Sequence, residues 1–285
     1  MAHYDLLVLG SGPAGQKAAI QAAKLRKKVA IVEKEQVGGA SVNTGTLPSK
    51  TLKDAIYYLH GAKLRSFTNM SVSLKKSFTM SDLMARKDHV IKNELAIITN
   101  QLERNDVEIV HGTASFHDAH TIRVATQHGH EELLSADFIV IATGSRPRHE
   151  PAIPFNSANI CDSDSILAAD TMPKTMAVLG GGVIGCEYAC IFRAIGFEVT
   201  VVDGRSTIMQ FVDGEAAQAL AKSMEESGIK FVLGSRLKDA KVRGPIVHCA
   251  LEDGKVLETE VLFFAAGRTP NTDKIGLERL GIKIG

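Results

Sequence analysis

The chain has 285 residues, about twice the length of a single domain of roughly 150 residues, and 45% of them are hydrophobic, as is ordinary for a globular protein. Lysine and arginine number 33 against 32 for aspartate and glutamate, so the formal charge of +1 gives no electrostatic reason to bind nucleic acid or a membrane surface. We therefore expect two globular cores whose partners are small soluble molecules.

The first residues and the cysteines favour a cytoplasmic location. Residues 4–9 form an apolar strand pattern with no signal-like leader, and no run approaches the roughly 20 apolar residues that a membrane span needs. The 4 cysteines lack the paired spacing of a secreted disulphide scaffold. A reducing compartment without a membrane partner is the expectation.

The first elements predict a strand, a helix and a second strand. Residues 4–9 predict the first strand, and residues 10–15 (GSGPAG) predict a glycine-rich turn. The alanine-rich stretch to about Lys24 predicts a helix, and residues 29–32 predict a strand that ends at Glu33. This order is that of a βαβ unit.

A long helix and several strands follow. Apolar residues at helical spacing predict an amphipathic helix over residues 81–105. Short strands are predicted at 107–110 and 121–124, and a strongly apolar strand at 138–142 stops before Thr143. The helix is interpreted as structural.

The same βαβ order recurs in the second half of the chain. Residues 176–179 predict a strand, residues 180–185 (GGGVIG) a glycine turn, and the next residues a helix through about Ile195. A strand at 198–202 then ends at Asp203. Before this unit, a connector is indicated by Pro147, Pro151 and Pro154. After it, Asp253 and Gly254 predict a hairpin turn, and residues 261–265 predict a last apolar strand.

Each glycine turn has the residues that a dinucleotide requires. The first glycine permits a tight turn, the second lets the backbone approach the pyrophosphate, and the third lets the helix pack closely. The helix N-terminus then offers amide donors to the phosphates, and the acid that ends the second strand can bind ribose hydroxyls. In chain order these residues are Gly10, Gly12, Gly15 and Glu33, then Gly180, Gly182, Gly185 and Asp203.

The repetition makes the dinucleotide interpretation strong. A single GxGxxG is weak evidence because glycine turns are common, but both copies here stand between a strand and a helix, and both are followed by an acid. We therefore predict an α/β fold with two Rossmann-like dinucleotide-binding domains.

Residues 38–50 (GGASVNTGTLPSK) resemble the active-site segment of the pyridine nucleotide-disulphide oxidoreductases, which include lipoamide dehydrogenase and glutathione reductase. The reductases of that family carry cysteines at the positions of Ser41 and Thr46. Disulphide exchange needs a thiolate that attacks sulphur and a second thiol that resolves the mixed disulphide, and hydroxyls cannot replace them. We expect no disulphide reductase activity.

The chain resembles one branch of that family, the soluble, Si-specific NAD(P)+ transhydrogenases, over essentially its whole length. This branch lacks a complete redox pair, although its members often keep a cysteine at the position of Ser41. The resemblance implies FAD-dependent hydride transfer from NADPH to NAD+ in two half-reactions at one nicotinamide site, with ping-pong kinetics. The motifs that carry it are IATGSRP at 141–147, DSDSIL at 162–167, IGCEYA at 184–189 and GRT at 267–269.

The resemblance also implies the order of the domains. An NAD(P) domain at 149–268 is inserted in an FAD domain whose first segment is 1–148 and whose return segment begins at 269–285. Full-length relatives are homo-oligomers, and we expect the remainder of the return segment and the C-terminal dimerisation domain to be absent from this chain.

By the same resemblance, Lys50 and Glu187 match a lysine and a glutamate that pair beside the flavin ring. An ammonium group there favours the anionic reduced ring, and a carboxylate partner keeps the lysine charged and oriented. We assign both as catalytic and cofactor-binding residues. The resemblance and the turn pattern add further cofactor-binding positions at Lys34, Gly38, Gly39, Ser41, Thr46, Ala114, Thr143, Gly144 and Gly267.

Asp203 and Arg205 together predict that both nicotinamide nucleotides bind. The carboxylate suits the 2′-hydroxyl of NADH but repels the 2′-phosphate of NADPH unless Arg205 offsets its charge. The cofactors expected are therefore FAD, NAD(H) and NADP(H).

Other interpretations stay open. A lipoamide dehydrogenase-like diaphorase or NAD(P)H oxidase without its redox disulphide is one alternative, and an inactive nucleotide-binding fragment is another. Cys186 and Cys190 stand four residues apart on one predicted helix, but no histidine or cysteine lies nearby at ligand spacing, so we expect no metal site.

Overall fold

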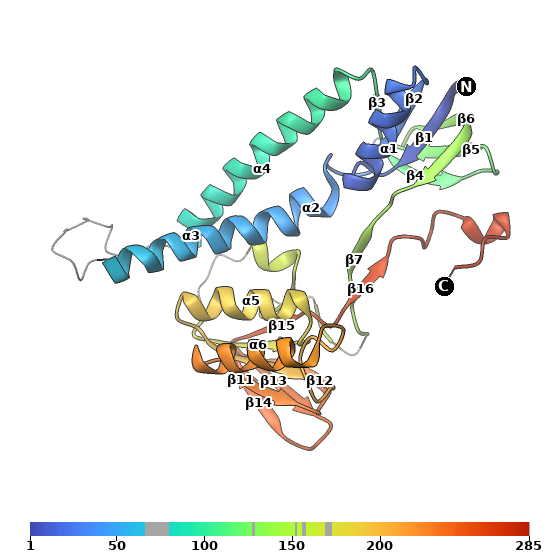
Figure 1. Ribbon diagram of the computed structural model, residues 1–285. Coiled ribbons are helices and arrows are strands. Elements are labelled where there is room, and N and C mark those ends of the chain that lie inside the picture. The colour runs from blue at the N-terminus through green and yellow to red at the C-terminus, as the bar shows by residue number, and fades with distance from the viewer. Residues whose placement is uncertain (66–79, 127–128, 152, 156–157, 169–172, 285) are drawn as a thin grey trace. The chain divides into compact units, whose positions relative to one another are not determined.

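The computed structural model describes residues 1–65, 80–126, 129–151, 153–155, 158–168 and 173–284 (Figure 1). The chain forms two compact units, and each consists of more than one segment. Unit 1 contains Met1–Pro48, His89–Arg146 and Thr269–Gly285, and unit 2 contains Ser49–Asp88 and Pro147–Arg268.

Unit 1 is built on a six-stranded sheet with helix α1 (Pro13–Lys24) against strands β1 and β2 (Figure 1). Its first half is parallel and its second half antiparallel. Leu7, Val8 and Leu9 are almost fully buried, as expected for a parallel strand that is covered on both faces. In spatial order the strands are β3 (Glu108–His111), β2 (Val29–Glu33), β1 (Ala2–Leu9), β6 (Glu131–Ile141), β5 (Thr121–Ala125) and β4 (Thr113–Phe116).

The predicted first βαβ unit and the predicted long helix are confirmed. Helix α4 spans Met80–Glu103, and Ile98 and Leu102 on its second half are buried in the core cluster that contains Val8 and Ile31. Strand β6 begins at Glu131, before the predicted start at residue 138, because residues 131–135 pair with β5 in an antiparallel hairpin.

The C-terminal segment of the chain joins unit 1. The Phe116 amide donates to the Ile275 carbonyl at 2.8 Å, and Ile275 and Leu277 lie in a core cluster with residues of β1. Arg146 binds the Asp273 carboxylate with both terminal nitrogens, at 2.9 and 3.1 Å. Strand β16 (Arg268–Pro270) pairs with β7 (Ser145–Pro147), and helix η2 (Leu277–Leu280) follows.

Unit 2 is built on a five-stranded parallel sheet, and helix α5 (Val183–Ala194) packs on β9 and β10 (Figure 1). This confirms the second predicted βαβ unit, and the two sheets confirm the predicted α/β class. In spatial order the strands are β11 (Lys230–Leu233), β10 (Glu198–Asp203), β9 (Thr175–Leu179), β15 (Val261–Phe264) and β8 (Ile160–Asp162).

A three-stranded antiparallel sheet also belongs to unit 2. The predicted turn at Asp253 and Gly254 is confirmed, since the Gly254 amide donates to the Leu251 carbonyl between β13 and β14. The strands are β12 (Leu237–Arg243), β13 (Ile246–Leu251) and β14 (Val256–Thr259). The unit also contains helix α6 (Gly214–Glu226) and the short helix η1 (Ser165–Ala168).

Helices α2 (Gly39–Asn43) and α3 (Thr46–Arg65) were not predicted from the sequence. Pro48 in the first turn of α3 is compatible with a helix because the amides of that turn have no intrahelical acceptor. Leu52 and Ile56 of α3 share a core cluster with Tyr188 and Phe192, which is why Ser49–Asp88 groups with unit 2. The boundaries expected from sequence place all of 1–148 in one domain, and they stay a prediction.

Among the described residues, no helix has both the length and the apolar character that crossing a bilayer requires.

Candidate functional site

The first glycine turn in unit 1 is fixed by close backbone packing. Gly10 has φ +102°, and a Cβ there would lie 2.5 Å from the Ala142 carbonyl oxygen. A Cβ on Gly15 would overlap the Gly10 carbonyl, so the helix can pack this closely only with glycine. At Gly12, by contrast, a Cβ would meet only Gly39 Cα, at 4.0 Å. The second glycine therefore leaves open space beside the backbone.

The turn in unit 2 repeats this geometry. Gly180 has φ +111° and a Cβ on it would lie 2.5 Å from the Ala265 carbonyl oxygen, while a Cβ on Gly185 would overlap the Gly180 carbonyl. Beside Gly182 nothing lies within 4 Å of the Cβ position among the described atoms. In both units the first and third glycines are needed by the protein itself, and the second leaves room for a ligand.

The acids predicted to bind ribose contact the glycine turns. Glu33 Oε2 accepts from the backbone amide and the hydroxyl of Ser11, at 2.9 and 2.6 Å. Asp203 Oδ2 accepts from the backbone amide of Gly181 at 2.6 Å. In each unit the acid lies 22 residues after the amide that it binds, and both acids are buried. The acids thus hold the turns in shape.

The helices that follow the two turns have no side-chain cap among the described residues, although α1 begins at Pro13, which has no amide to donate. Gly12 and Gly182 are the N-cap residues of α1 and α5, and in the described structure neither helix has a side-chain cap hydrogen bond. The first amides of a helix carry a partial positive charge and need acceptors. With the open space beside the second glycine, this geometry fits a phosphate-bearing ligand in each unit.

The segment after β2 packs against the first turn. Gly38 and Gly39 have φ +97° and +60°, and a Cβ on Gly39 would lie 2.8 Å from Gly12 Cα. Asn43 donates from Nδ2 to the carbonyls of Val37 and Gly39, both at 3.0 Å. Its Oδ1 is buried and has no partner among the described residues, which leaves an acceptor available for a ligand donor or a water molecule.

The other positions assigned in unit 1 are distributed over its loops. Thr143 and Gly144 follow β6, and both carbonyls are bound by Asn271 at 2.9 and 3.0 Å. Lys34 is exposed and pairs with its neighbour Glu35 at 2.9 Å. The remaining positions are Ser41 on α2, Thr46 at the start of α3 and Ala114 on β4, while Gly267 of unit 2 precedes β16.

Helix α3 places Ser49, and not Lys50, against Glu187 of α5. The Ser49 hydroxyl lies 3.5 Å from Glu187 Oε1. Lys50 is exposed, and among the described residues no carboxylate lies within 4.0 Å of its ammonium group. Neighbouring residues on a helix point about 100° apart, so the face that carries Ser49 cannot also carry Lys50. The expected Lys50–Glu187 ion pair is therefore not formed in this structure.

Asp203, which is buried, and Arg205, which is exposed, form an ion pair at the end of β10. Arg205 donates from its backbone amide and Nε to Oδ1, at 2.8 and 2.9 Å, and from Nη2 to Oδ2 at 2.6 Å. Burial disfavours the charged carboxylate, but the hydrogen bonds from Arg205 and Gly181 outweigh it and hold the pKa of Asp203 below its ordinary value. The pairing that the sequence suggested is present, and Arg205 neutralises the acid.

The Asp203→Asn variant is expected to lose about 2 kcal/mol of unfolding free energy at pH 7, because Arg205 and the Gly181 amide lose a charged acceptor. Since the folded-state pKa is lowered, the stabilisation is complete above the ordinary pKa of about 3.9 and is lost as pH falls through the folded value. Urea unfolding at pH 7 and pH 3 tests this, with Asp106→Asn at an exposed carboxylate as control. If wild type and Asp203→Asn lost the same unfolding free energy between pH 7 and pH 3, the stabilising role of the ionised Asp203 would be refuted.

The cysteines show no features of a redox or metal site. Burial raises the pKa of the Cys161 and Cys249 thiols to about 12 and that of Cys186 to about 11, so the reactive thiolate is suppressed. The pKa of Cys190 is also raised by burial. Within the described ranges, no group of three or more histidine, cysteine or acidic residues is arranged to hold a metal ion.

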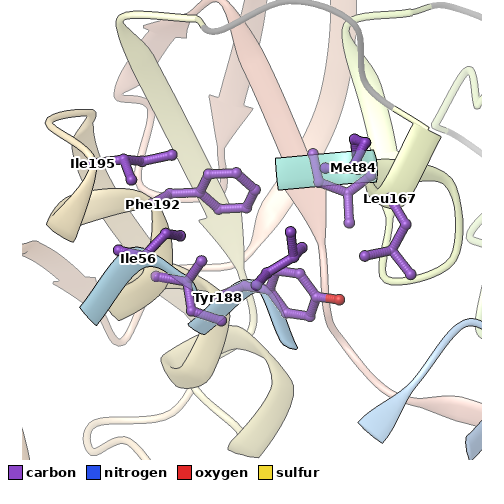
Figure 2. A pocket seen from close by; sticks show the side chains of 9 residues that line it. Ile56, Met84, Leu167, Tyr188, Phe192 and Ile195 are labelled. Carbon is purple, nitrogen blue, oxygen red and sulfur yellow. The ribbon is translucent and has the colours of Figure 1, made fainter. Parts of the chain in front are cut away.

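A small apolar cavity in unit 2 is separate from the glycine turn. It has a volume of about 10 Å³, room for about one water molecule, so it cannot hold a nucleotide. Tyr188 presents its buried hydroxyl near this cavity, and that oxygen has no partner among the described residues (Figure 2). The lining comes from α3, α4, η1, α5 and the C-cap residue of α5, and it consists of Leu52, Ile56, Met84, Ile166, Leu167, Tyr188, Ile191, Phe192 and Ile195.

Sequence reasoning missed three residues of the sites. Ser11 and Gly181 occupy the second position of the two turns, where their amides bind the acids, and Asn43 holds the loop that packs on Gly12. The equal spacing of 22 residues between each amide and its acid was present in the sequence and marks this contact.

Comparisons with known proteins place the chain among its relatives. A family model described as pyridine nucleotide-disulphide oxidoreductase matches residues 4–285. Proteins named soluble pyridine nucleotide transhydrogenase are 41% identical over 286 residues in Mycobacterium tuberculosis and 38% identical over 288 residues in Pseudomonas putida. The alignments cover 100% and 99% of this chain but 61% of each relative, so the chain spans about three fifths of their length.

Solved structures show the same fold. LpdA from Mycobacterium tuberculosis has a TM-score of 0.90 at 27% identity, over 100% of this chain and 62% of its own. The HOCl-induced flavoprotein disulphide reductase RclA from Escherichia coli has a TM-score of 0.87 at 24% identity, over 100% of this chain and 61% of its own, a likeness of fold alone. With a family match over nearly its whole length, the chain belongs to the pyridine nucleotide-disulphide oxidoreductase family.

Proposed function

We propose that the protein transfers hydride between NADPH and NAD+ through bound FAD, as a soluble, Si-specific pyridine nucleotide transhydrogenase. One observation carries the proposal. The two glycine turns have the same geometry. In each, an acid binds a backbone amide of the turn, the helix that follows has no side-chain cap among the residues described, and there is open space beside the second glycine. Two dinucleotides, and not one, therefore have a site to bind. The FAD site is in unit 1 and the NAD(P) site in unit 2.

Two hydroxyl side chains in place of the reductases' two thiols distinguish this function from disulphide reduction. Ser41 and Thr46 stand where the family's reductases have thiols, and Cys161, Cys186 and Cys249 are buried with raised pKa values. No dithiol exchange can start from these residues. The relatives at 41% and 38% identity, which bear the name soluble pyridine nucleotide transhydrogenase, support the same choice.

The chain's own residues bind and orient the nucleotides. Bound FAD would supply a two-electron centre that accepts and returns hydride. The amides at the start of α1 would bind one pyrophosphate and those at the start of α5 the other, while Glu33 and Asp203 keep the turns in shape. Lys50 would supply positive charge to the flavin, and a role for Glu187 would require a pairing with Lys50 that the described part of the structure does not contain.

Thio-NAD+ reduction by NADPH tests the proposal, because it reports transhydrogenation directly. We expect turnover with parallel double-reciprocal plots, as a ping-pong mechanism requires. Lipoamide and glutathione disulphide are the controls and should not be reduced. Electron transfer from NADPH to dyes or oxygen without thio-NAD+ reduction would favour the diaphorase or oxidase alternative. A protein that cannot be reconstituted with FAD would favour the inactive fragment.

A further inference from the structure

Arg236 lies at the same sheet edge as the glycine turn of unit 2. Strands β9, β10 and β11 are adjacent and parallel, so the loops that follow them meet at one edge. The Gly234 amide donates to the Arg205 carbonyl at 2.9 Å, and the Arg236 carbonyl accepts from Glu252 at 2.9 Å. The loop after β11 is thus held against the loop after β10.

The Arg236 side chain lies over Gly204, between Asp203 and Arg205. A Cβ on Gly204 would overlap Arg236 Cγ and lie 2.8 Å from Arg236 Nε. Glycine at 204 is therefore what makes room for this arginine. Its φ is not in the left-handed region, so backbone conformation does not demand glycine there.

Arg236 is also the arginine at this edge with its charge available. Arg205 uses its backbone amide, Nε and Nη2 to bind the Asp203 carboxylate, and the two charges cancel. Arg236 is exposed, and in the part of the chain that the structure describes no carboxylate lies within 4.0 Å of its guanidinium group. The net charge of these three residues is one positive unit, and Arg236 carries it.

We propose that Arg236 binds the 2′-phosphate of NADP(H) and so determines affinity for the phosphorylated nucleotide. The inference rests on the proposed function, which places a nicotinamide nucleotide in unit 2. The ribose of a dinucleotide on this turn lies at the end of β10, where Asp203 and Arg205 stand. A guanidinium group binds phosphate oxygens through two parallel donors, and a 2′-hydroxyl offers no comparable anion. Arg236 thus favours NADP(H), and the Asp203–Arg205 pair accepts either nucleotide.

The test compares NADP+ and NAD+ binding by calorimetry to the purified, FAD-loaded protein and its variants. We expect Arg236→Gln to weaken NADP+ binding by about tenfold or more and NAD+ binding by less than about twofold. Arg236→Lys keeps the charge and should retain part of the NADP+ affinity. The matched control is Arg243→Gln. Arg243 is an exposed arginine at the far end of β12, about 20 Å from the end of the strand that follows Arg236.

The outcomes separate this inference from the function on which it rests. A selective loss of NADP+ affinity in Arg236→Gln, absent from Arg243→Gln, supports the inference. Equal losses for both nucleotides, or none, overturn it while the proposed function stands. Failure of the wild-type protein to bind either nucleotide overturns both. Raising the salt concentration should reduce the difference between wild type and Arg236→Gln for NADP+, because a charged contact is screened.

Discussion

The Gly182→Ala variant is expected to fold as well as the wild type and to bind NAD+ and NADP+ at least about tenfold more weakly. Gly182 has φ −86° and ψ −172°, which any residue adopts, and no described atom lies within 4 Å of the added methyl group. The methyl group would occupy the space through which the proposed pyrophosphate approaches the backbone. Loss of affinity without loss of stability is the mark of a ligand-facing glycine.

Gly185→Ala, three residues along the chain, is expected to give the opposite result. Its Cβ would overlap the Gly180 carbonyl, so β9 and α5 must separate and the unfolding free energy should fall by about 3 kcal/mol or more. Thermal unfolding without nucleotide and calorimetric titration with NAD+ distinguish the two variants. Equal affinity in Gly182→Ala and wild type would show that no phosphate approaches this turn.

The elements that sequence predicted well are those in which local and global signals agree. The strand at residues 4–9, the turn at 10–15 and the strand that ends at Glu33 could be read from apolar runs and glycines, because buried parallel strands are continuously apolar. The same holds for the unit that ends at Asp203. Repetition of the whole pattern made the fold class predictable.

Other features depend on tertiary contacts that no local pattern carries. The segment at 38–50 could be matched to a family motif. That helix α3 begins within this segment, at Thr46, could not be foreseen from the sequence Thr-Leu-Pro-Ser-Lys. That helix turns Ser49 toward Glu187 and Lys50 away from it, so a motif alone suggested a contact that the backbone does not make. Likewise, the sequence suggested Glu33 and Asp203 as ribose-binding acids, which stays a prediction, and their contact with the turn amides could be seen only in the folded loop.

The Arg236 side chain shows the same limit at longer range. Gly204 looks like one more turn residue in the sequence, and Arg236 follows it 32 positions later, in the loop after β11. Only the pairing of β10 with β11 brings the two loops together. Gly204 leaves room for a side chain that is distant in the sequence, and this requirement cannot be recognised without knowing that pairing.

Replacing Lys50 by methionine is expected to slow the reduction of bound FAD by NADPH about 100-fold, with nucleotide affinity changed by less than about threefold. Removing one preorganised charge or donor from a site where negative charge develops has effects of this order. The ammonium group should also stabilise the anionic reduced ring, so Lys50→Met should lower the reduction potential of the flavin. Rapid mixing with NADPH and a redox titration measure the two effects.

The neighbouring residues provide the comparison that makes this test specific. Glu187→Gln should slow the reaction less than Lys50→Met, since no ion pair joins Glu187 to Lys50 in the described structure and the carboxylate could act only through the lysine. Ser49→Ala removes the 3.5 Å contact to Glu187 but no charge, and it should leave the rate within about threefold of wild type. If Ser49→Ala and Lys50→Met slowed flavin reduction equally, the position of α3 would matter and the charge of Lys50 would not. If Lys50→Met left both the rate of flavin reduction and the reduction potential unchanged, Lys50 would have no part in hydride transfer and would be an exposed surface residue of α3.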